Sequence, residues 1–89
     1  MQFEYRTRGT CSSRIIFEID DNRLHNVQYI GGCNGNLQGV SRLVEGMDVD
    51  AVIEKLKGIR CGMKPTSCPD QLSLALLEAK AALEKETNV

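Results

Sequence analysis

The sequence predicts an α+β fold, in which a three-stranded antiparallel sheet is followed by three helices packed on one of its faces. Between residues 2 and 30, apolar side chains alternate with polar ones, which is typical of half-buried strands. Between residues 37 and 86 they recur every three or four positions, which is typical of amphipathic helices. Because the strand connections are short, we expect an antiparallel meander whose other, more polar face is solvated.

Three strands are expected in the first third of the chain. The first covers residues 2–8 and the second covers residues 14–20. The turn sequence at residues 20–23 follows, where aspartate and asparagine tolerate a left-handed backbone. The third strand is expected at residues 24–30. The apolar residues that alternate along the first two strands are Phe3, Tyr5, Ile15, Phe17 and Ile19.

Two helices are expected after the strands. Asn34 or Asn36 is the predicted N-cap of the first, and Gly46 the residue that ends it. Asp48 is the predicted N-cap of the second, and Gly58 closes it. The apolar stripes of the two helices are Leu37, Val40 and Val44, and then Val49, Val52, Ile53 and Leu56.

A third helix is expected to begin near Pro69 and to run to about Glu86. Proline is favoured at the first helical position, and the acid that follows it, Asp70, suits the helix dipole. This places Cys68 at the N-cap or next to it. The buried face of the helix is predicted to carry Leu72, Leu76, Ala79 and Leu83.

Length and charge limit the class of protein. The chain has 89 residues, which predicts a single domain over residues 1–89. Its net charge of −1 and its pI near 5.8 predict no nucleic-acid partner. No apolar run is long enough to span a membrane, and the first residues lack the apolar core of a signal peptide. We therefore expect a cytoplasmic protein, either a monomer or a homodimer.

Four cysteines are unusual for so short a chain. They are Cys11, Cys33, Cys61 and Cys68. In a reducing compartment such a set indicates metal binding or redox chemistry before structural disulfides. The order of the expected strands and helices brings all four to one end of the sheet, although their spacing contains no CxxC pair. The alternative to such a site is that the four cysteines are buried separately as small apolar residues and do not meet.

The surroundings of the cysteines favour thiolates. Cys33 and Cys68 each lie beside a predicted helix N-terminus, where free amides and the dipole stabilise negative charge. Four thiolates around Zn²⁺ carry a net negative charge, which nearby cations would offset. The single histidine, His25, is expected on a strand away from this end and is not a predicted ligand. The candidate cations for tuning the site are Arg8 and Arg14 near Cys11, and Arg60 and Lys64 near Cys61.

One motif carries a family resemblance. The run Thr66-Ser67-Cys68-Pro69-Asp70 resembles the signature of the TSCPD domain family, and the whole chain is similar to its small stand-alone members with four cysteines. Relatives of this domain form the C-terminal end of adenosylcobalamin-dependent ribonucleotide reductases. The resemblance implies association with such a reductase. It does not supply the catalytic barrel, which 89 residues cannot contain, so we lean against an enzyme.

A more distant resemblance is to NifU-type iron–sulfur scaffold proteins. It involves the three-stranded start of the chain, Cys11, Gly32-Cys33 and Cys68. Ser13 stands where the scaffolds carry an aspartate, and Cys61 is an additional thiol. The resemblance implies a NifU-like fold with a more permanent, all-thiolate site.

Three functions follow from these observations. The first is a metal-binding module accessory to ribonucleotide reductase, with a structural zinc or an iron–sulfur cluster on the four cysteines. A sphere of four thiolates leaves no open position for water, which argues against catalytic zinc. The alternatives are a thiol–disulfide redox partner of the reductase, with Cys61 and Cys68 as the pair, and a protein that assembles or delivers clusters to an iron–sulfur acceptor protein.

Overall fold

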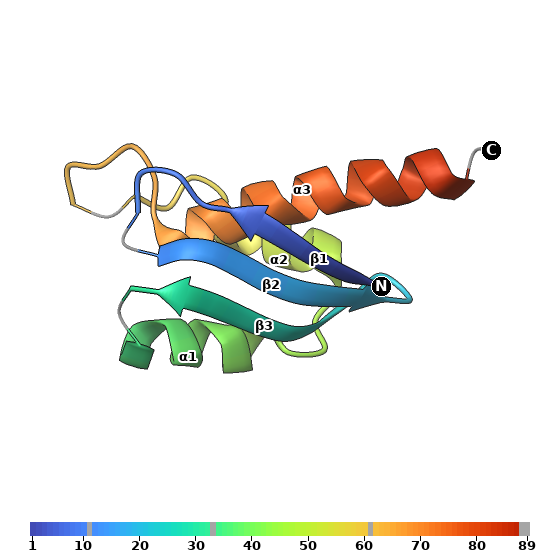
Figure 1. Ribbon diagram of the computed structural model, residues 1–89, viewed down its shortest axis with the longest axis horizontal. Coiled ribbons are helices and arrows are strands. Elements are labelled where there is room, and N and C mark those ends of the chain that lie inside the picture. Colours follow the sequence, from blue (N-terminus) through green and yellow to red (C-terminus); the bar gives the residue numbers. More distant parts are fainter. Residues whose placement is uncertain (11, 33, 61, 88–89) are drawn as a thin grey trace.

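Three strands and three helices follow one another along the chain in a computed structural model that describes residues 1–10, 12–32, 34–60 and 62–87. The arrangement confirms the predicted α+β class (Figure 1). The strands are β1 (Gln2–Arg6), β2 (Ser12–Asp20) and β3 (Arg23–Gly31). The helices are α1 (Asn34–Val44), α2 (Val49–Leu56) and α3 (Cys68–Thr87).

The sheet is an antiparallel meander with strand order β1-β2-β3. Asp21 and Asn22 join β2 to β3 with φ angles of 54° and 60°, the left-handed conformation that a two-residue hairpin turn requires. This confirms the predicted turn. β2 begins earlier than predicted, because Ser12 pairs with Gly31 at the far end of β3.

The core lies between the sheet and the helices. Phe3 and Phe17 stack with ring centroids 5.6 Å apart, so β1 and β2 are joined by aromatic contact as well as by backbone pairing. Among the described residues, the largest fully buried apolar side chains are Phe17, Ile15, Leu24, Leu72, Leu76, Val49 and Val52, which come from β2, β3, α2 and α3.

The opposite face of the sheet is polar, as predicted. Arg14 and Glu4 form an ion pair across β1 and β2 at 2.8 Å on this face. Ile16 lies beside them and is half-buried, while Gln28 is exposed. No helix covers this face in Figure 1.

The helices begin and end largely where the sequence predicts. Asp48 is the N-cap of α2 and accepts a hydrogen bond from Ala51 N at 3.1 Å. α1 begins at Asn34, so Asn34 and Asn36 lie inside the helix and the prediction that one of them is its N-cap is wrong. Within the described ranges, no helix combines the length and the apolar character that crossing a membrane requires.

The turn between α1 and α2 is attached to β3. Leu24 N donates to Met47 O at 2.9 Å, and Gly46 N donates to Leu24 O at 2.7 Å. Gly46 has a φ of 76°, which allows the sharp turn after α1.

Figure 1 shows the two ends of the sheet. The β2–β3 turn lies at one end, which we call the hairpin end. At the other end, β1 and β3 finish, β2 begins, and α1 and α3 begin. The connection of residues 57–67, between α2 and α3, runs past this second end, which we call the α3-start end.

Candidate thiol site at the start of the third helix

The start of α3 fixes the position of Cys68. Ser67 is the N-cap, because its hydroxyl accepts a hydrogen bond from Asp70 N at 3.1 Å and its carbonyl accepts one from Gln71 N at 2.8 Å. Cys68 is therefore the first helical residue, next to the N-cap as predicted. Pro69 follows at the second position, where a missing N–H leaves no helical hydrogen bond unmade.

Asp70 connects this helix start to the end of α2. Its carboxylate accepts hydrogen bonds from Thr66 Oγ1 at 2.5 Å and from Gly58 N at 2.7 Å. From the sequence, Asp70 is expected only to interact with the helix dipole. The four-residue spacing between Thr66 and Asp70 was the available signal for the side-chain contact, whereas the contact with Gly58 depends on tertiary structure.

Gln71 connects the same helix start to the segment after β1. Its Oε1 accepts a hydrogen bond from Arg8 N at 3.0 Å, and its Nε2 donates to Thr66 Oγ1 at 2.9 Å. The Gln71 side chain is buried, and no local sequence pattern predicts its role. Together, Asp70 and Gln71 hold three separate parts of the chain around the first turn of α3.

The Cys68 side chain is 8% exposed and lies against the start of β2. Its Sγ is 3.3 Å from Ser12 Oγ, and Ser12 is itself buried. Tyr29 of β3 donates its hydroxyl to Cys68 O at 3.1 Å. The thiol is therefore held between the start of β2, the last part of β3 and the first turn of α3.

The electrostatics of Tyr29 reflect this enclosure. Burial raises the pKa of the Tyr29 phenol well above its usual range, and negative charge on Cys68 raises that pKa further. Tyr29 therefore stays protonated at physiological pH. It can act there as a permanent hydrogen-bond donor to the backbone of Cys68.

The other three predicted ligands, Cys11, Cys33 and Cys61, lie outside the described residues. Their predicted meeting with Cys68 therefore stays a prediction. Ser12, the chain neighbour of Cys11, contacts the Cys68 sulfur, and Gly31, two residues before Cys33, pairs with Ser12. Within the described part of the chain, no three His, Cys, Asp or Glu side chains lie close enough together to hold a metal ion.

In a comparison with protein-family models, residues 3–80 match the TSCPD domain. The chain belongs to the TSCPD domain family. Neither the search of curated proteins nor that of solved structures found a match. In this TSCPD domain each residue of the signature Thr66-Ser67-Cys68-Pro69-Asp70 lies at the start of α3, either in its first turn or hydrogen-bonded to it.

The four predicted tuning cations of the TSCPD domain are all exposed. Arg14 pairs with Glu4 on the polar face of the sheet. Arg8 lies beyond β1, while Arg60 and Lys64 belong to the connection of residues 57–67. A cation in bulk solvent is screened and affects a buried charge weakly, so their tuning of the site stays a prediction.

His25 lies near the hairpin end, away from Cys68, as predicted. Its Nδ1 is 2.6 Å from Glu45 Oε2. Glu45 also accepts a hydrogen bond from Asn26 N at 2.8 Å. The bond from Asn26 N, followed by the one with His25, lowers the pKa of the Glu45 carboxyl. At the hairpin end of the TSCPD domain, these hydrogen bonds join β3 to Glu45, the residue that follows α1.

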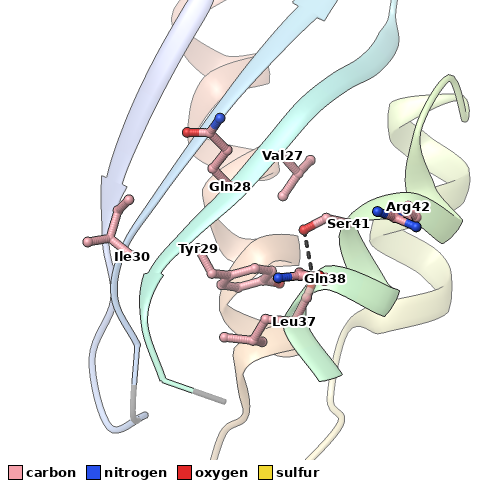
Figure 2. A pocket seen from close by; sticks show the side chains of 8 residues that line it. All are labelled: Val27, Gln28, Tyr29, Ile30, Leu37, Gln38, Ser41 and Arg42. Atoms are coloured by element: carbon pink, nitrogen blue, oxygen red, sulfur yellow. Dashed lines mark hydrogen bonds between the residues drawn. The ribbon is translucent and has the colours of Figure 1, made fainter. Parts of the chain in front are cut away.

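A surface hollow of about 380 Å³ lies between β3 and α1. Figure 2 shows Val27 and Tyr29 of β3 facing Leu37 and Gln38 of α1 across it. Ser41 donates its hydroxyl to Leu37 O at 2.8 Å, so that hydroxyl is already engaged. Among the described residues that line the hollow, Arg42 is the one charged side chain, and none of the others is an acid or a base. The hollow therefore lacks paired groups for acid–base chemistry.

Proposed function

We propose that this TSCPD domain is a small metal-binding module whose four cysteines, Cys11, Cys33, Cys61 and Cys68, hold a structural Zn²⁺ or an iron–sulfur cluster. The observation that carries the proposal is the 3.3 Å contact between Cys68 Sγ and Ser12 Oγ. Ser12 is the chain neighbour of Cys11, and its partner Gly31 precedes Cys33 by two residues. Segments distant in the sequence thus meet beside the Cys68 thiol.

The chemistry of the start of α3 fits a metal-bound thiolate. The dipole of α3 favours negative charge on Cys68, its first residue. The Ser12 hydroxyl is within hydrogen-bonding distance of the sulfur, and such outer contacts orient a ligand and tune its basicity. Four thiolates suit zinc and iron–sulfur clusters equally, so the spectrum of the protein has to distinguish them. A metal bound there would supply folding free energy.

The burial of Cys68 counts against the redox alternative. Thiol–disulfide exchange needs direct attack of one sulfur on another, and a side chain that is 8% exposed offers little access to a protein partner. A ribonucleotide reductase is the partner to test first, because of the family relationship stated above. The proposal is a structural or accessory role beside such an enzyme, with delivery of a cluster to an acceptor protein as the second candidate.

Metal analysis of anaerobically purified protein tests the proposal. We expect about one zinc per chain without visible absorption, or iron with acid-labile sulfide and visible charge-transfer bands. Each Cys→Ser substitution should remove most of the metal. Negligible metal together with four titratable thiols would contradict the proposal, and a Cys61–Cys68 disulfide would then favour the redox alternative.

Ser67→Ala is the matched control. It removes the N-cap of α3 beside Cys68 but leaves every thiol in place. Loss of this cap should cost about 1 kcal/mol of stability while the metal content stays at the wild-type value. Equal metal loss in Ser67→Ala and Cys68→Ser would mean that helix folding, rather than ligation, explains the result. Release of the metal to an apo-acceptor would move the proposal toward delivery.

A further inference from the structure

The two ends of the molecule differ in how their charged side chains are paired, although the net charge is only −1. At the hairpin end Lys80 pairs with Asp50, and the Arg23 guanidinium donates to Gly46 O. Asn22 donates to both Asp48 and Asp50, which places these carboxylates at the hairpin end with Asp20, Asp21 and Glu45. The cations of the α3-start end lie in β1, in β2 and in two connections at this end, which are residues 7–10 after β1 and the connection of residues 57–67 (Figure 1). They are Arg6, Arg8, Arg14, Arg60 and Lys64.

Most of these cations form no ion pair within the described residues, although Glu4 and Glu78 border the same shallow hollow as Arg6 and Arg8. Arg6, Arg8, Arg60 and Lys64 are exposed and form no ion pair with any residue in the described ranges. Arg14 pairs with Glu4 but also stands directly opposite Arg6 in the β1–β2 register. Like charges at opposite positions of a sheet are destabilising, which an external anion would relieve.

An apolar side chain lies among the cations. Met63 is fully exposed in the connection that also carries Arg60 and Lys64, and Ile59 is 41% exposed in the same connection. Methionine is flexible and polarisable, and it is common at surfaces that adapt to a partner. An apolar contact bordered by charge is the usual composition of a protein–protein interface.

The two connections form one continuous surface. Gly9 packs so closely on Thr66 that a Cβ atom at Gly9 would lie 3.2 Å from Thr66 Cγ2. Arg8, which precedes Gly9 in the chain, donates its backbone N–H to Gln71 Oε1. The cations on both sides can therefore act on the same ligand.

The surface fits a polypeptide better than a lone phosphate. Arg6 and Arg14 border a shallow hollow of about 440 Å³ together with Thr7 and Ser13. The Thr7 hydroxyl already donates to Ser12 O at 2.5 Å and the Ser13 hydroxyl to Ile30 O at 3.1 Å, so neither offers a proton to a phosphate. The cations are spread over two connections instead of converging on one point.

From these observations we propose that the α3-start end is a docking surface for an acidic segment of a partner protein. Met63 provides the apolar contact, and Arg6, Arg8, Arg14, Arg60 and Lys64 provide the charge. The docking surface contains no thiol ligand, although Arg8, Arg14, Arg60 and Lys64 are also the cations predicted to tune the thiol site. Such a surface would present the region around Cys68 to the partner.

Fluorescence anisotropy with a labelled acidic peptide tests the docking surface. The probe is a fluorescein-labelled dodecapeptide of aspartate and glutamate with one central leucine, titrated with the purified full chain. Arg60→Glu combined with Lys64→Glu should weaken binding by about fivefold or more. The control, Arg42→Glu with Lys55→Glu, changes the net charge equally on exposed positions of α1 and α2 and should stay within about twofold.

A second pair of variants separates the apolar contact from the charge. Met63→Ser should weaken binding, while Leu43→Ser, at a 78% exposed position of α1, should not. Equal weakening by the two charge-reversal pairs would overturn the proposal. Displacement of the peptide by inorganic phosphate at lower concentration, or concentration-dependent self-association in sedimentation velocity, would overturn it in favour of a phosphate ligand or a second copy of the chain.

Discussion

The two ends of this TSCPD domain differ in how their polar groups are used. At the hairpin end they pair with one another: Asn22 donates to Asp48 at 2.9 Å, and Glu45 binds both His25 and Asn26. At the α3-start end the side chain of Asp70 is also hydrogen-bonded, but among the exposed cations there only Arg14 forms an ion pair within the described ranges. The polar groups of the hairpin end are therefore paired within the domain, whereas most cations of the α3-start end are available to a ligand.

This difference explains why stability and function can be changed separately. Contacts at the hairpin end and in the core are expected to set the free energy of unfolding. Exposed residues at the α3-start end are expected to affect binding and to leave stability almost unchanged. The following substitutions test that division.

The largest expected effect is on the core beneath the hairpin end. Leu24 is completely buried, so Leu24→Ala removes apolar contacts and leaves a cavity. We expect a loss of about 2–5 kcal/mol in the free energy of unfolding, measured by urea denaturation. Met63→Ala, at the fully exposed position of the α3-start end, should change it by less than about 0.5 kcal/mol. Similar losses in both variants would show that the connection of residues 57–67 is part of the core.

The next effect concerns the first turn of α3. Asp70→Ala removes the acceptor for Thr66 Oγ1 and Gly58 N. We expect a loss of about 1–2 kcal/mol by urea denaturation, because two hydrogen bonds to a charged group disappear at a helix N-terminus. Glu78→Ala, an exposed position further along α3, is the control and should have a small effect. A neutral Asp70→Ala would mean that the end of α2 does not depend on this contact.

Tyr29→Phe tests the hydrogen bond to the Cys68 carbonyl. We expect a loss of about 0.5–1.5 kcal/mol, because the part-buried hydrogen bond that joins β3 to the start of α3 disappears. The raised pKa of Tyr29 predicts that its phenol does not ionise in an ultraviolet titration until the protein unfolds. Tyr5→Phe is the control, since no hydrogen bond joins the Tyr5 hydroxyl to another residue of the described part. Ionisation of Tyr29 in the folded protein near pH 10 would contradict its enclosure.

The smallest expected effect is the acid sensitivity of the hairpin end. The hydrogen bond from Asn26 N, followed by the one with His25, lowers the pKa of Glu45. The hydrogen bond from Lys80, followed by the one from Asn22, lowers the pKa of Asp50. A lowered carboxyl pKa in the folded state gives stability that is present above the ordinary carboxyl range and is lost as pH falls through the folded-state value.

The corresponding measurement is the slope of stability against pH. Between about pH 5 and pH 3, Glu45→Gln combined with Asp50→Asn should flatten the decrease seen in the wild type. Tyr29→Phe should keep the wild-type slope, because it changes no carboxylate. An unchanged slope in the double variant would show that these two carboxylates do not cause the loss of stability at low pH.

The elements of the fold were predictable because their signals are local. The alternation of Phe3, Tyr5, Ile15 and Phe17 and the cap at Asp48 each involve neighbours within one element, and the structure confirms them. The start of α1 was not predicted correctly, because helix boundaries vary by one or two residues around a local cap signal.

The candidate site was predictable only in part. The position of Cys68 beside the N-cap follows from the residues around it, and the structure confirms it. The contacts of Asp70 with Gly58, and of Gln71 with Arg8, join segments that are far apart in the sequence, so no local pattern reveals them. The convergence of Cys11, Cys33 and Cys61 on Cys68 stays a prediction for metal analysis.

The turn between α1 and α2 has a consequence for aggregation. β3 is an edge strand, and its unpaired backbone groups could otherwise recruit a strand from another molecule. Leu24 N and O are bonded to Met47 and Gly46, and the Glu45 carboxylate occupies the N–H of Asn26. The first half of this edge is thereby unavailable for sheet extension, so the fold protects part of itself against growth into intermolecular β-structure.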